Sequence, residues 1–240
     1  FNYFYENPKL KYNLLMVASA EEETAGDKSL RYLLPYLPKI DFAIIGEPTQ
    51  MELAIAEKGL VVFDIEIKGT PSHAAHPNKD NPLMKLPDII KKIENISFEK
   101  VSPILGPVKL TLTQINAGSQ HNVVPSEVKL VLDVRVNECY QNHEIDEVIQ
   151  KALPCNVKAR SLHLKSSSIS IDHPIVKAGE KLGRKTYGSP TLSDQASLSC
   201  PSLKLGPGDS TRSHSSDEFI YVKEIEEGIS IYINLLKQII

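Results

Sequence analysis

Three short segments carry side chains whose types and spacing fit the binding of divalent cations. The acidic triplet Glu21-Glu22-Glu23 directly follows an apolar run, and Glu47 directly follows the next apolar run. His214 lies far along the chain, in a loop rich in glycine and serine. Carboxylate oxygen and imidazole nitrogen suit hard-to-borderline divalent cations, and no sulfur ligand is implied. We expect these residues to converge on one site.

The acidic triplet also fits acid–base chemistry. Hydrolysis by a cation-activated water needs a carboxylate that is not a ligand and that accepts the water proton. Adjacent glutamates in an irregular turn can divide these duties, because their side chains diverge. An isolated acidic triplet is more often solvated loop charge, and Glu47 fits an exposed strand exit about equally well. Their position at the carboxyl ends of buried strands favours the functional interpretation.

Three further polar residues are ambiguous on sequence grounds. His73 follows an amphipathic strand and fits a hydrogen-bond donor to a developing oxyanion, or an ordinary polar loop residue. Arg135 fits a fork for a substrate carboxylate, or a solvated residue of a half-exposed strand. Asn122, next to Val-Val-Pro, is equally open.

Bulk composition excludes several classes of protein. The 240 residues are 41% hydrophobic and 24% charged, with a formal net charge of -3, so no basic surface for nucleic acid is indicated. A small or amphoteric substrate fits better. Three isolated cysteines and no apolar run of membrane-spanning length predict a cytoplasmic protein without membrane association.

The first part of the chain has the pattern of an α/β unit. Residues 13–19 form a nearly continuous apolar run, which predicts a strand buried on both faces. Helical spacing follows over 27–37, and a second short strand is predicted at 42–45. Ligands of such units gather beyond the carboxyl ends of the strands, where both acidic segments lie.

The pattern changes at Gly59, where apolar and polar residues begin to alternate with a period of two. The order strand, helix, strand, strand, helix, strand follows, with strands at 59–68, 108–116, 128–136 and 156–164. Helices are predicted at 83–93 and 143–152, with Asn142 as a candidate N-cap. This order is the ferredoxin-like β-α-β-β-α-β arrangement, and we assign it to residues 59–166.

The last part of the chain returns to α/β character. A helix is predicted at 174–182, a short strand at 202–205 and a terminal helix that carries Ile225, Ile229, Tyr232, Leu236 and Ile239. The sequence therefore predicts an α/β fold in which residues 1–58 and 167–240 form one domain and the ferredoxin-like domain is inserted into it.

In this order the motifs resemble the M20 metallopeptidase family, in its acetylornithine deacetylase and succinyl-diaminopimelate desuccinylase branch. The resemblance covers essentially the whole chain. It rests on the acidic triplet, Gly-Glu-Pro-Thr at 46–49, Gly-x-x-x-His at 69–73, Asn-Val-Val-Pro at 122–125 with Asp133-x-Arg135, Ser193-Asp194, and Gly-Pro-Gly at 206–208 followed by His214.

The resemblance implies a zinc-exopeptidase-like metal-binding domain with an inserted lid or dimerisation domain. Glu22 would be the general base, and Glu23 with His214 would bind one cation. Glu47 would bind the other. The two cations would be zinc, with cobalt as an alternative, and a shift of roles by one residue within the triplet stays open.

The other implied roles concern the inserted domain and the substrate. His73 would reach the active site of a neighbouring subunit, which implies a homodimer, and Asn122 and Arg135 would contact the substrate. The implied reaction removes an acetyl or succinyl group from the α-amino nitrogen of an ornithine-like amino acid in arginine biosynthesis. An M20 deacylase or dipeptidase with another small-molecule substrate remains an alternative.

One departure from the family pattern bears on the cation sites. The family's His-x-Asp segment and its bridging Asp are expected before Phe1, and no His-x-Asp occurs in this sequence. We therefore expect a chain without the N-terminal segment and with incomplete cation sites. A catalytically incomplete dimerisation or ligand-binding module is the alternative from a different functional class.

Overall fold

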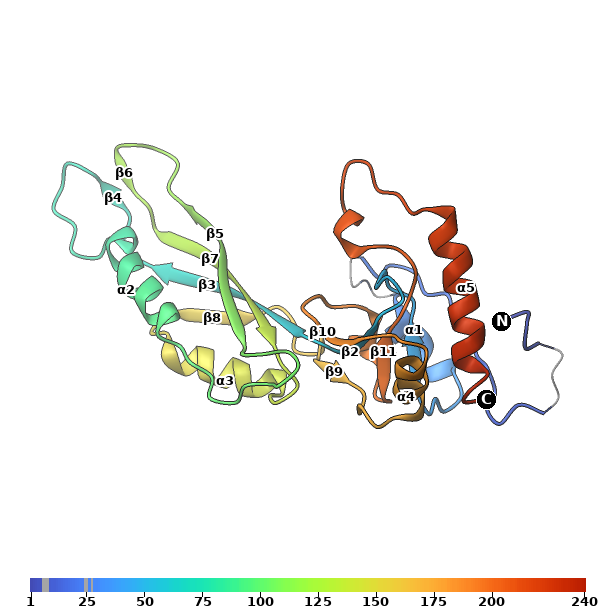
Figure 1. Ribbon diagram of the computed structural model, residues 1–240. Helices are drawn as coiled ribbons and strands as arrows, with labels where there is room; N and C mark the ends of the chain where they lie inside the picture. The colour runs from blue at the N-terminus through green and yellow to red at the C-terminus, as the bar shows by residue number, and fades with distance from the viewer. Residues whose placement is uncertain (6–8, 24–25, 27) are drawn as a thin grey trace. The chain divides into compact units, whose positions relative to one another are not determined.

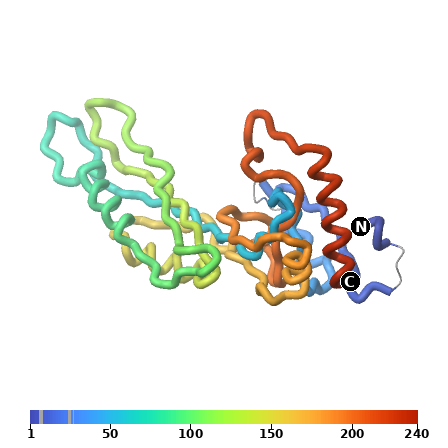
Figure 2. Tube along the Cα trace, in the orientation of Figure 1, coloured from blue at the N-terminus to red at the C-terminus, as the bar shows by residue number. Residues whose placement is uncertain are grey.

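The chain forms two compact units, each with its own sheet (Figure 1). The computed structural model describes residues 1–5, 9–23, 26 and 28–240. Unit 1 contains Phe1–Glu57 and Ser167–Ile240, and unit 2 contains Lys58–Ser166. Figure 2 follows the chain out of unit 1 after Glu57 and back into it at Ser167.

Unit 1 is built on a mixed sheet whose main path has the order β1-β11-β2-β10. Its strands are β1 (Ala43–Ile45), β2 (Leu53–Glu57), β9 (Ser167–Ser168), β10 (Thr186–Ser189) and β11 (Ser202–Lys204). β1 runs parallel to β11, β10 runs parallel to β2, and β9 pairs with β2 off the main path. Every residue of β2 is buried, as expected for a central strand.

The helices of unit 1 bury apolar residues against this sheet. They are α1 (Leu30–Leu33), η1 (Leu34–Tyr36), α4 (Pro174–Lys181), η2 (Asp194–Ser197), η3 (Ser210–Arg212) and α5 (Val222–Leu236). Leu53, Ile175, Leu203 and Leu235 are almost fully buried in one apolar cluster. A side chain at Gly179 of α4 would collide with Leu53, so glycine lets α4 lie close to β2.

Unit 2 is an antiparallel sheet of order β5-β7-β3-β8. Its strands are β3 (Gly59–Lys68), β5 (Lys109–Ala117), β7 (Glu127–Val136) and β8 (Asn156–Ala159), with a separate short pair of β4 (Ser72–His73) and β6 (Val123–Val124). The sheet order with two helices is the ferredoxin-like arrangement, so the α/β fold class is confirmed.

Alternation along β3 explains which face of this sheet is covered. Val61, Phe63, Ile65 and Ile67 are at most 2% exposed, while the residues between them are half-buried or exposed. Helices α2 (Pro82–Glu94) and α3 (Asn142–Ala152) contribute the other side of the core with residues such as Ile89 and Ile145. The chain thus folds in the register that its period-two pattern predicts.

The predicted strand at 13–19 does not form. These residues have no regular secondary structure, and Leu15, Met16 and Val17 are exposed. A strand exists only where a neighbour supplies hydrogen bonds, and no strand in the described part of the chain pairs with this segment. Apolar composition predicted burial correctly only where a partner strand is present.

Two predicted helix starts also need correction. The helix expected over 27–37 is reduced to α1 and the 3-10 turn η1, because Pro35 interrupts it, and residue 27 lies outside the described residues. Gln141, not Asn142, caps α3. Asn142 is buried, and its Nδ2 donates to the carbonyl oxygens of Leu162 and Leu164 instead.

Other differences concern short elements. The strand predicted to run to Leu164 ends at Ala159, and on α5 the residues Ile225 and Ile229 are exposed. Strands β2, β9 and β10 were not predicted, since each is too short for a periodic pattern. Among the described residues, no helix is long and apolar enough to cross a membrane.

Candidate functional site

The turn that holds Glu47 and the loop that leads to His214 are joined by backbone hydrogen bonds. We call residues 46–50 the Glu47 turn and residues 206–218 the His214 loop. The N–H groups of Thr49 and Met51 both donate to the carbonyl oxygen of Gly206, at 3.1 and 2.9 Å. Gln50 N–H donates to the carbonyl oxygen of Gly208 at 2.8 Å. Thr49 and Asp209 also form an isolated antiparallel bridge, beyond the end of the parallel pairing of β1 with β11.

Gly206 is required for this close approach. A Cβ at this position would lie 2.5 Å from the carbonyl oxygen of Glu47, which is backbone and unable to move aside. Thr49 completes the junction, because its Oγ1 accepts from the N–H of Gly206 at 3.2 Å. The sequence Gly-Glu-Pro-Thr therefore works together with Gly-Pro-Gly, although the two segments are far apart in the chain.

The acidic turn, Glu21-Glu22-Glu23, lies within electrostatic reach of Glu47. Glu23 Oε2 is 3.5 Å from His214 Nε2, which ties the acidic turn to the His214 loop. The charge of Glu47 also reaches the acidic turn, since it helps to raise the pKa of Glu22. The acidic turn is thus linked to the His214 loop by the Glu23–His214 contact and to the Glu47 turn by the electrostatic effect of Glu47 on Glu22.

Burial and mutual repulsion raise the pKa of both central carboxyls. The pKa of Glu22 is raised by burial first and then by the charges of Glu47, Glu23 and Asp194. The pKa of Glu47 is raised by burial, against a lowering by the Lys204 ammonium. Negative charge in this cluster therefore exceeds what its surroundings neutralise, and a bound cation would offset the repulsion.

Glu21 has a different environment from its two neighbours. Its Oε2 accepts from the backbone N–H of Lys28 at 3.0 Å, and its carboxyl group lies so close to Gly26 that a Cβ there would be 2.3 Å from Oε2. The side chain thus closes the loop that follows the acidic turn. This arrangement favours Glu22 and Glu23 over Glu21 as the residues available for chemistry.

A buried ion pair lies beside the cluster, at the ends of β2 and β11. Lys204 and Glu57 are 3% and 0% exposed, and Lys204 Nζ is 3.0 Å from Glu57 Oε2. Lys204 Nζ also donates to Ser189 Oγ and to the carbonyl oxygen of Thr191, both at 3.0 Å. Buried charges are tolerated only when paired and hydrogen-bonded in this way.

The His214 loop is held by Arg212, whose guanidinium forms a bidentate pair with Glu224 of α5. The Nη1–Oε2 and Nη2–Oε1 distances are 2.8 and 2.6 Å. The guanidinium also lies over the rings of Phe219 and Tyr221, at 5.0 and 5.2 Å from their centroids. This packing fixes the chain on either side of His214.

The Arg212 pair predicts a specific dependence of stability on pH. Its hydrogen bonds lower the pKa of Glu224 from 4.5 to about 2. A carboxyl group with a depressed folded-state pKa stabilises the fold fully above its unfolded pKa and loses that contribution as the pH falls through the folded value. We expect the Tm advantage of the wild type over Glu224→Gln to be constant above pH 4.5 and to vanish toward pH 2. Thermal unfolding at stepped pH measures it, and an advantage unchanged down to pH 2 would contradict the assignment.

In unit 2 the structure places His73 next to the residue pair 122–123. His73 pairs with Val123 across the β4–β6 ladder, and the N–H of Ala74 donates to the carbonyl oxygen of Asn122 at 2.9 Å. His73 Nδ1 accepts from the N–H of Ala75 at 3.1 Å. The neutral ring therefore carries its proton on Nε2, and this exposed N–H is a donor.

Arg135 is not placed beside His73 and Asn122. It pairs with Leu60 at the start of β3, whereas the β4–β6 pair follows the other end of that strand. Its guanidinium contacts Asp133 on the same strand, with Nε–Oδ1 and Nη2–Oδ2 distances of 2.9 and 3.1 Å. A substrate carboxylate would have to compete with Asp133 for this fork.

Three residues of the site were not predicted as functional from the sequence. Asp194 shifts the pKa of both Glu22 and Glu47, and its Oδ2 accepts from Ser19 Oγ. Lys204 was not predicted to be part of the site, although a lysine within the run Ser202-Leu-Lys-Leu indicates a buried ammonium group that needs an acidic partner. Ser193-Asp194 was noted as a motif without a role.

The donor set suits divalent cations by type. It offers carboxylate oxygens and one imidazole nitrogen, the ligands that zinc and similar ions accept. In the part of the chain that the structure describes, no three or more His, Cys, Asp or Glu side chains are placed to hold a metal ion together. The closest pair is Glu23 with His214, both largely exposed.

Comparison with known proteins agrees with this architecture. Residues 55–158, which cover most of unit 2, match the model of the M20 peptidase dimerisation domain. A Pyrobaculum aerophilum protein with the provisional name LysW-lysine/LysW-ornithine hydrolase is 27% identical over 231 residues, 92% of this chain and 64% of its own. A succinyl-diaminopimelate desuccinylase of Rickettsia felis is 25% identical, over 98% of this chain and 68% of its own. An acetylornithine deacetylase of Proteus mirabilis is 26% identical, over 92% and 62%.

Solved structures share the fold at lower identity. Aminopeptidase PepT from Bacillus cereus has a TM-score of 0.70 at 16% identity, covering 92% of this chain and 63% of that one. The YXEP protein of Bacillus subtilis, a dinuclear metal-binding peptidase of the M20 family, has a TM-score of 0.63 at 16% identity, covering 90% and 62%. The chain thus spans about two thirds of the length of the relatives and structures it matches.

The two units define an α/β protein with a ferredoxin-like insertion and an acidic cluster at the edge of its main sheet. The chain is similar to members of the M20 family, and residues 55–158 match the dimerisation domain of that family.

Proposed function

We propose that the protein is a metal-dependent amidohydrolase that removes an acyl group from the α-amino nitrogen of an amino acid. This proposal is supported by the contact of Glu23 with His214 and by the electrostatic effect of Glu47 on Glu22, which involve three distant segments of unit 1. The names of the relatives as deacylases and hydrolases of amino-acid derivatives support the same class of reaction.

Glu22 is the proposed general base. Burial and neighbouring negative charges raise its pKa, so it is suited to accept a proton. It would take the proton from the attacking water and later pass it to the leaving amine. Glu23 contacts His214, and Glu21 accepts a hydrogen bond from Lys28. Glu22 is therefore the residue of the triplet that we propose accepts the proton.

Glu23 and His214 are the proposed ligands of one cation, and Glu47 of the other. Two divalent cations, with zinc as the first candidate and cobalt as the second, would supply polarisation of the amide carbonyl and a lowered pKa of water. The hydrogen bonds of the Glu47 turn to Gly206 and Gly208, at the start of the His214 loop, support this proposal. Arg212 restricts the His214 loop further.

His73 of unit 2 is the proposed donor to the oxyanion that forms at the amide carbon. Its Nε2–H is exposed and its Nδ1 is satisfied by Ala75, so the ring has a fixed tautomer. Asn122 lies beside it and is proposed to contact the substrate. Arg135 is proposed to bind the substrate carboxylate, for which Asp133 would have to release one of its contacts.

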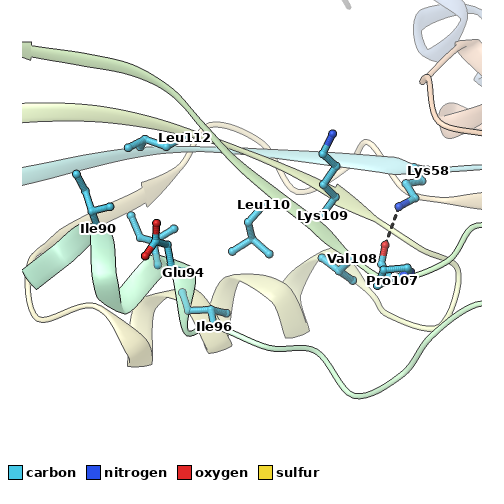
Figure 3. Close-up of a pocket in the computed structure, with 10 residues that line it drawn as sticks. Lys58, Ile90, Glu94, Ile96, Pro107, Val108, Lys109, Leu110 and Leu112 are labelled. Atoms are coloured by element: carbon cyan, nitrogen blue, oxygen red, sulfur yellow. Dashed lines mark hydrogen bonds between the residues drawn. The ribbon is translucent and has the colours of Figure 1, made fainter. Parts of the chain in front are cut away.

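We further propose a homodimer formed through unit 2. The match to a dimerisation domain supports it. So does strand β5, an edge strand of the sheet whose outer residues are largely exposed. Beside its start lies an apolar groove lined by Ile90 and Ile93 of α2 and by Val108 and Leu110 (Figure 3). Unit 2 would then serve as the lid and dimerisation domain, and unit 1 as the catalytic domain.

The proposed substrate is an N-acetyl or N-succinyl derivative of an ornithine-like amino acid, and the proposed role is in arginine biosynthesis. The related deacetylase and the LysW-ornithine relative support an ornithine-like amine. The desuccinylase relatives keep the succinyl group open. The cysteines Cys139, Cys155 and Cys200 are free thiols, in keeping with a proposed cytoplasmic location.

Assays of the full-length protein test this function. We expect hydrolysis of acetyl- or succinyl-ornithine that is abolished by a chelator and restored by zinc or cobalt. The citrulline counterparts serve as matched substrates for amine specificity. If dialysed protein keeps no divalent metal and cleaves none of the four compounds, the non-catalytic module is the better description.

A further inference from the structure

The acidic turn is poorly supported by backbone pairing. Residues 13–19 lead into it without regular structure, and within the described chain no strand pairs with them. A long-range side-chain bond attaches this segment instead. Ser19 Oγ donates to Asp194 Oδ2 at 2.5 Å, across 175 residues of sequence. An O–H···O⁻ bond of this length is charge-assisted and stronger than a neutral one.

The acceptor belongs to a rigid element. Asp194 begins the 3-10 turn η2, which Ser193 caps through a hydrogen bond from the N–H of Gln195. Gln195 is fully buried, and its Nε2 donates to the carbonyl oxygen of Ser202 in β11 at 2.8 Å. The 3-10 turn that contains Asp194 is therefore fixed to strand β11 of the sheet through Gln195.

The buried ion pair anchors the same turn from its other side. Ser193 Oγ donates to Glu57 Oε2 at 2.8 Å, and Glu57 pairs with Lys204 at 3.0 Å. Ser193 is itself buried. Side-chain contacts thus lead from Lys204 through Glu57 to Ser193, which directly precedes Asp194 in the chain.

We propose that Asp194 is a positioning residue, which through Ser19 holds the acidic turn so that Glu22 and Glu23 face Glu47 and His214. The element it fixes carries the proposed general base, whereas Asp194 is fixed to the sheet. Sites are most accurate when a flexible segment is held by a rigid one in this way. The effect on turnover rests on the proposed function, but the effect on the acidic turn does not.

A double-mutant cycle in the full-length protein tests the tether. We expect Ser19→Ala and Asp194→Asn each to lower kcat about 10- to 100-fold with a smaller change in KM, the range seen when partners that orient site residues are removed. The double variant should be no slower than the slower single variant, because both changes remove one bond. Ser19→Thr keeps the hydroxyl and should keep most of the activity.

A matched pair in unit 2 controls for a general loss of stability. Ser102 Oγ donates to Glu138 Oε1, also at 2.5 Å; Ser102 is buried and its Oγ also accepts from the N–H groups of Ile104 and Leu105. Ser102→Ala should lower Tm and leave kcat unchanged at a temperature well below Tm. A Ser19→Ala variant with wild-type kcat, or additive effects of Ser19→Ala and Asp194→Asn, would overturn the proposal.

Hydrogen exchange separates this inference from the proposed function. In both single variants we expect the backbone amides of Gly26 and Lys28, which donate to Glu21 of the acidic turn, to exchange faster, with those of β2 and β11 unchanged. If the wild type cleaves no acyl-amino acid, the proposed function fails, and faster exchange still supports the tether. Unchanged exchange in both variants would overturn the tether whether or not the protein is active.

Discussion

Glu22→Gln is expected to lower kcat of the full-length protein about 100- to 10,000-fold, the range that a positioned general base contributes. Glutamine preserves the size of the side chain and its polar contacts but accepts no proton from water. The bound metal should remain, because the proposed ligands are Glu23, Glu47 and His214. Turnover of the acyl-amino acid and metal content after dialysis measure the two effects separately.

The neighbouring glutamates provide matched controls for this substitution. Glu21 is the preceding residue, and its carboxylate accepts from the N–H of Lys28 and lies against Gly26. Glu21→Gln should therefore lower activity far less than Glu22→Gln. Glu23→Gln should instead lower the affinity for metal. If Glu21→Gln abolishes turnover and Glu22→Gln does not, the roles within the triplet are shifted by one residue.

His73→Ala is expected to lower kcat about 100- to 1,000-fold, as when one oxyanion donor is removed from a hydrolase. The effect should fall on kcat more than on KM, because the oxyanion forms only as the reaction proceeds. His76→Ala is the control. His76 lies 5.7 Å from His73 between ring centroids and is similarly exposed, but no role is proposed for it.

Mixed dimers test whether His73 acts on a neighbouring subunit. The mixture of His73→Ala and Glu22→Gln proteins should recover activity that neither has alone, because in a mixed dimer one site keeps its Glu22 and receives the partner's intact histidine. After random exchange of subunits at equal amounts, the expected recovery is about a quarter of the wild-type rate. No recovery in a confirmed mixed dimer would place His73 in the site of its own chain or outside catalysis.

Sequence patterns predicted unit 2 in detail because its strands are long and have one covered face. Val61, Phe63, Ile65 and Ile67 alternate strictly with polar residues, and this period has only one structural explanation. The covered face then determines where α2 and α3 pack. In unit 1 the strands have two to five residues and no alternation, so β2 and β10 could not be recognised as strands from the sequence.

The wrong prediction of a strand at 13–19 has a different origin. Its composition is that of a buried strand, but pairing is a property of two segments, and the sequence of one does not show whether its neighbour is present. The acidic turn still reaches the cluster, because Ser19 and Glu23 are held by side chains of residues 194 and 214. Such contacts between distant residues leave no periodic signal.

The roles predicted for Glu47 and His214 stay predictions, but the topology explains why the segments that carry them are neighbours. Glu47 follows β1 and the His214 loop follows β11, and these two parallel strands end at the same edge. The sequence did not predict the effect of Asp194 and Lys204 on the pKa of Glu22 and Glu47, because this effect depends on burial and on contacts with distant residues. The sequence motif includes Ser193-Asp194, but only the structure shows that these side chains contact Glu57 and Ser19.

The bonds between Gly206 and the Glu47 turn have a consequence for local unfolding. Thr49 and Met51 share one carbonyl acceptor, so neither turn nor loop can open without releasing the other. Segments coupled in this manner open as one cooperative unit in the native state. The sites for both cations should therefore be gained or lost together, and partial occupancy should reflect a mixture of molecules with both sites intact and molecules with neither.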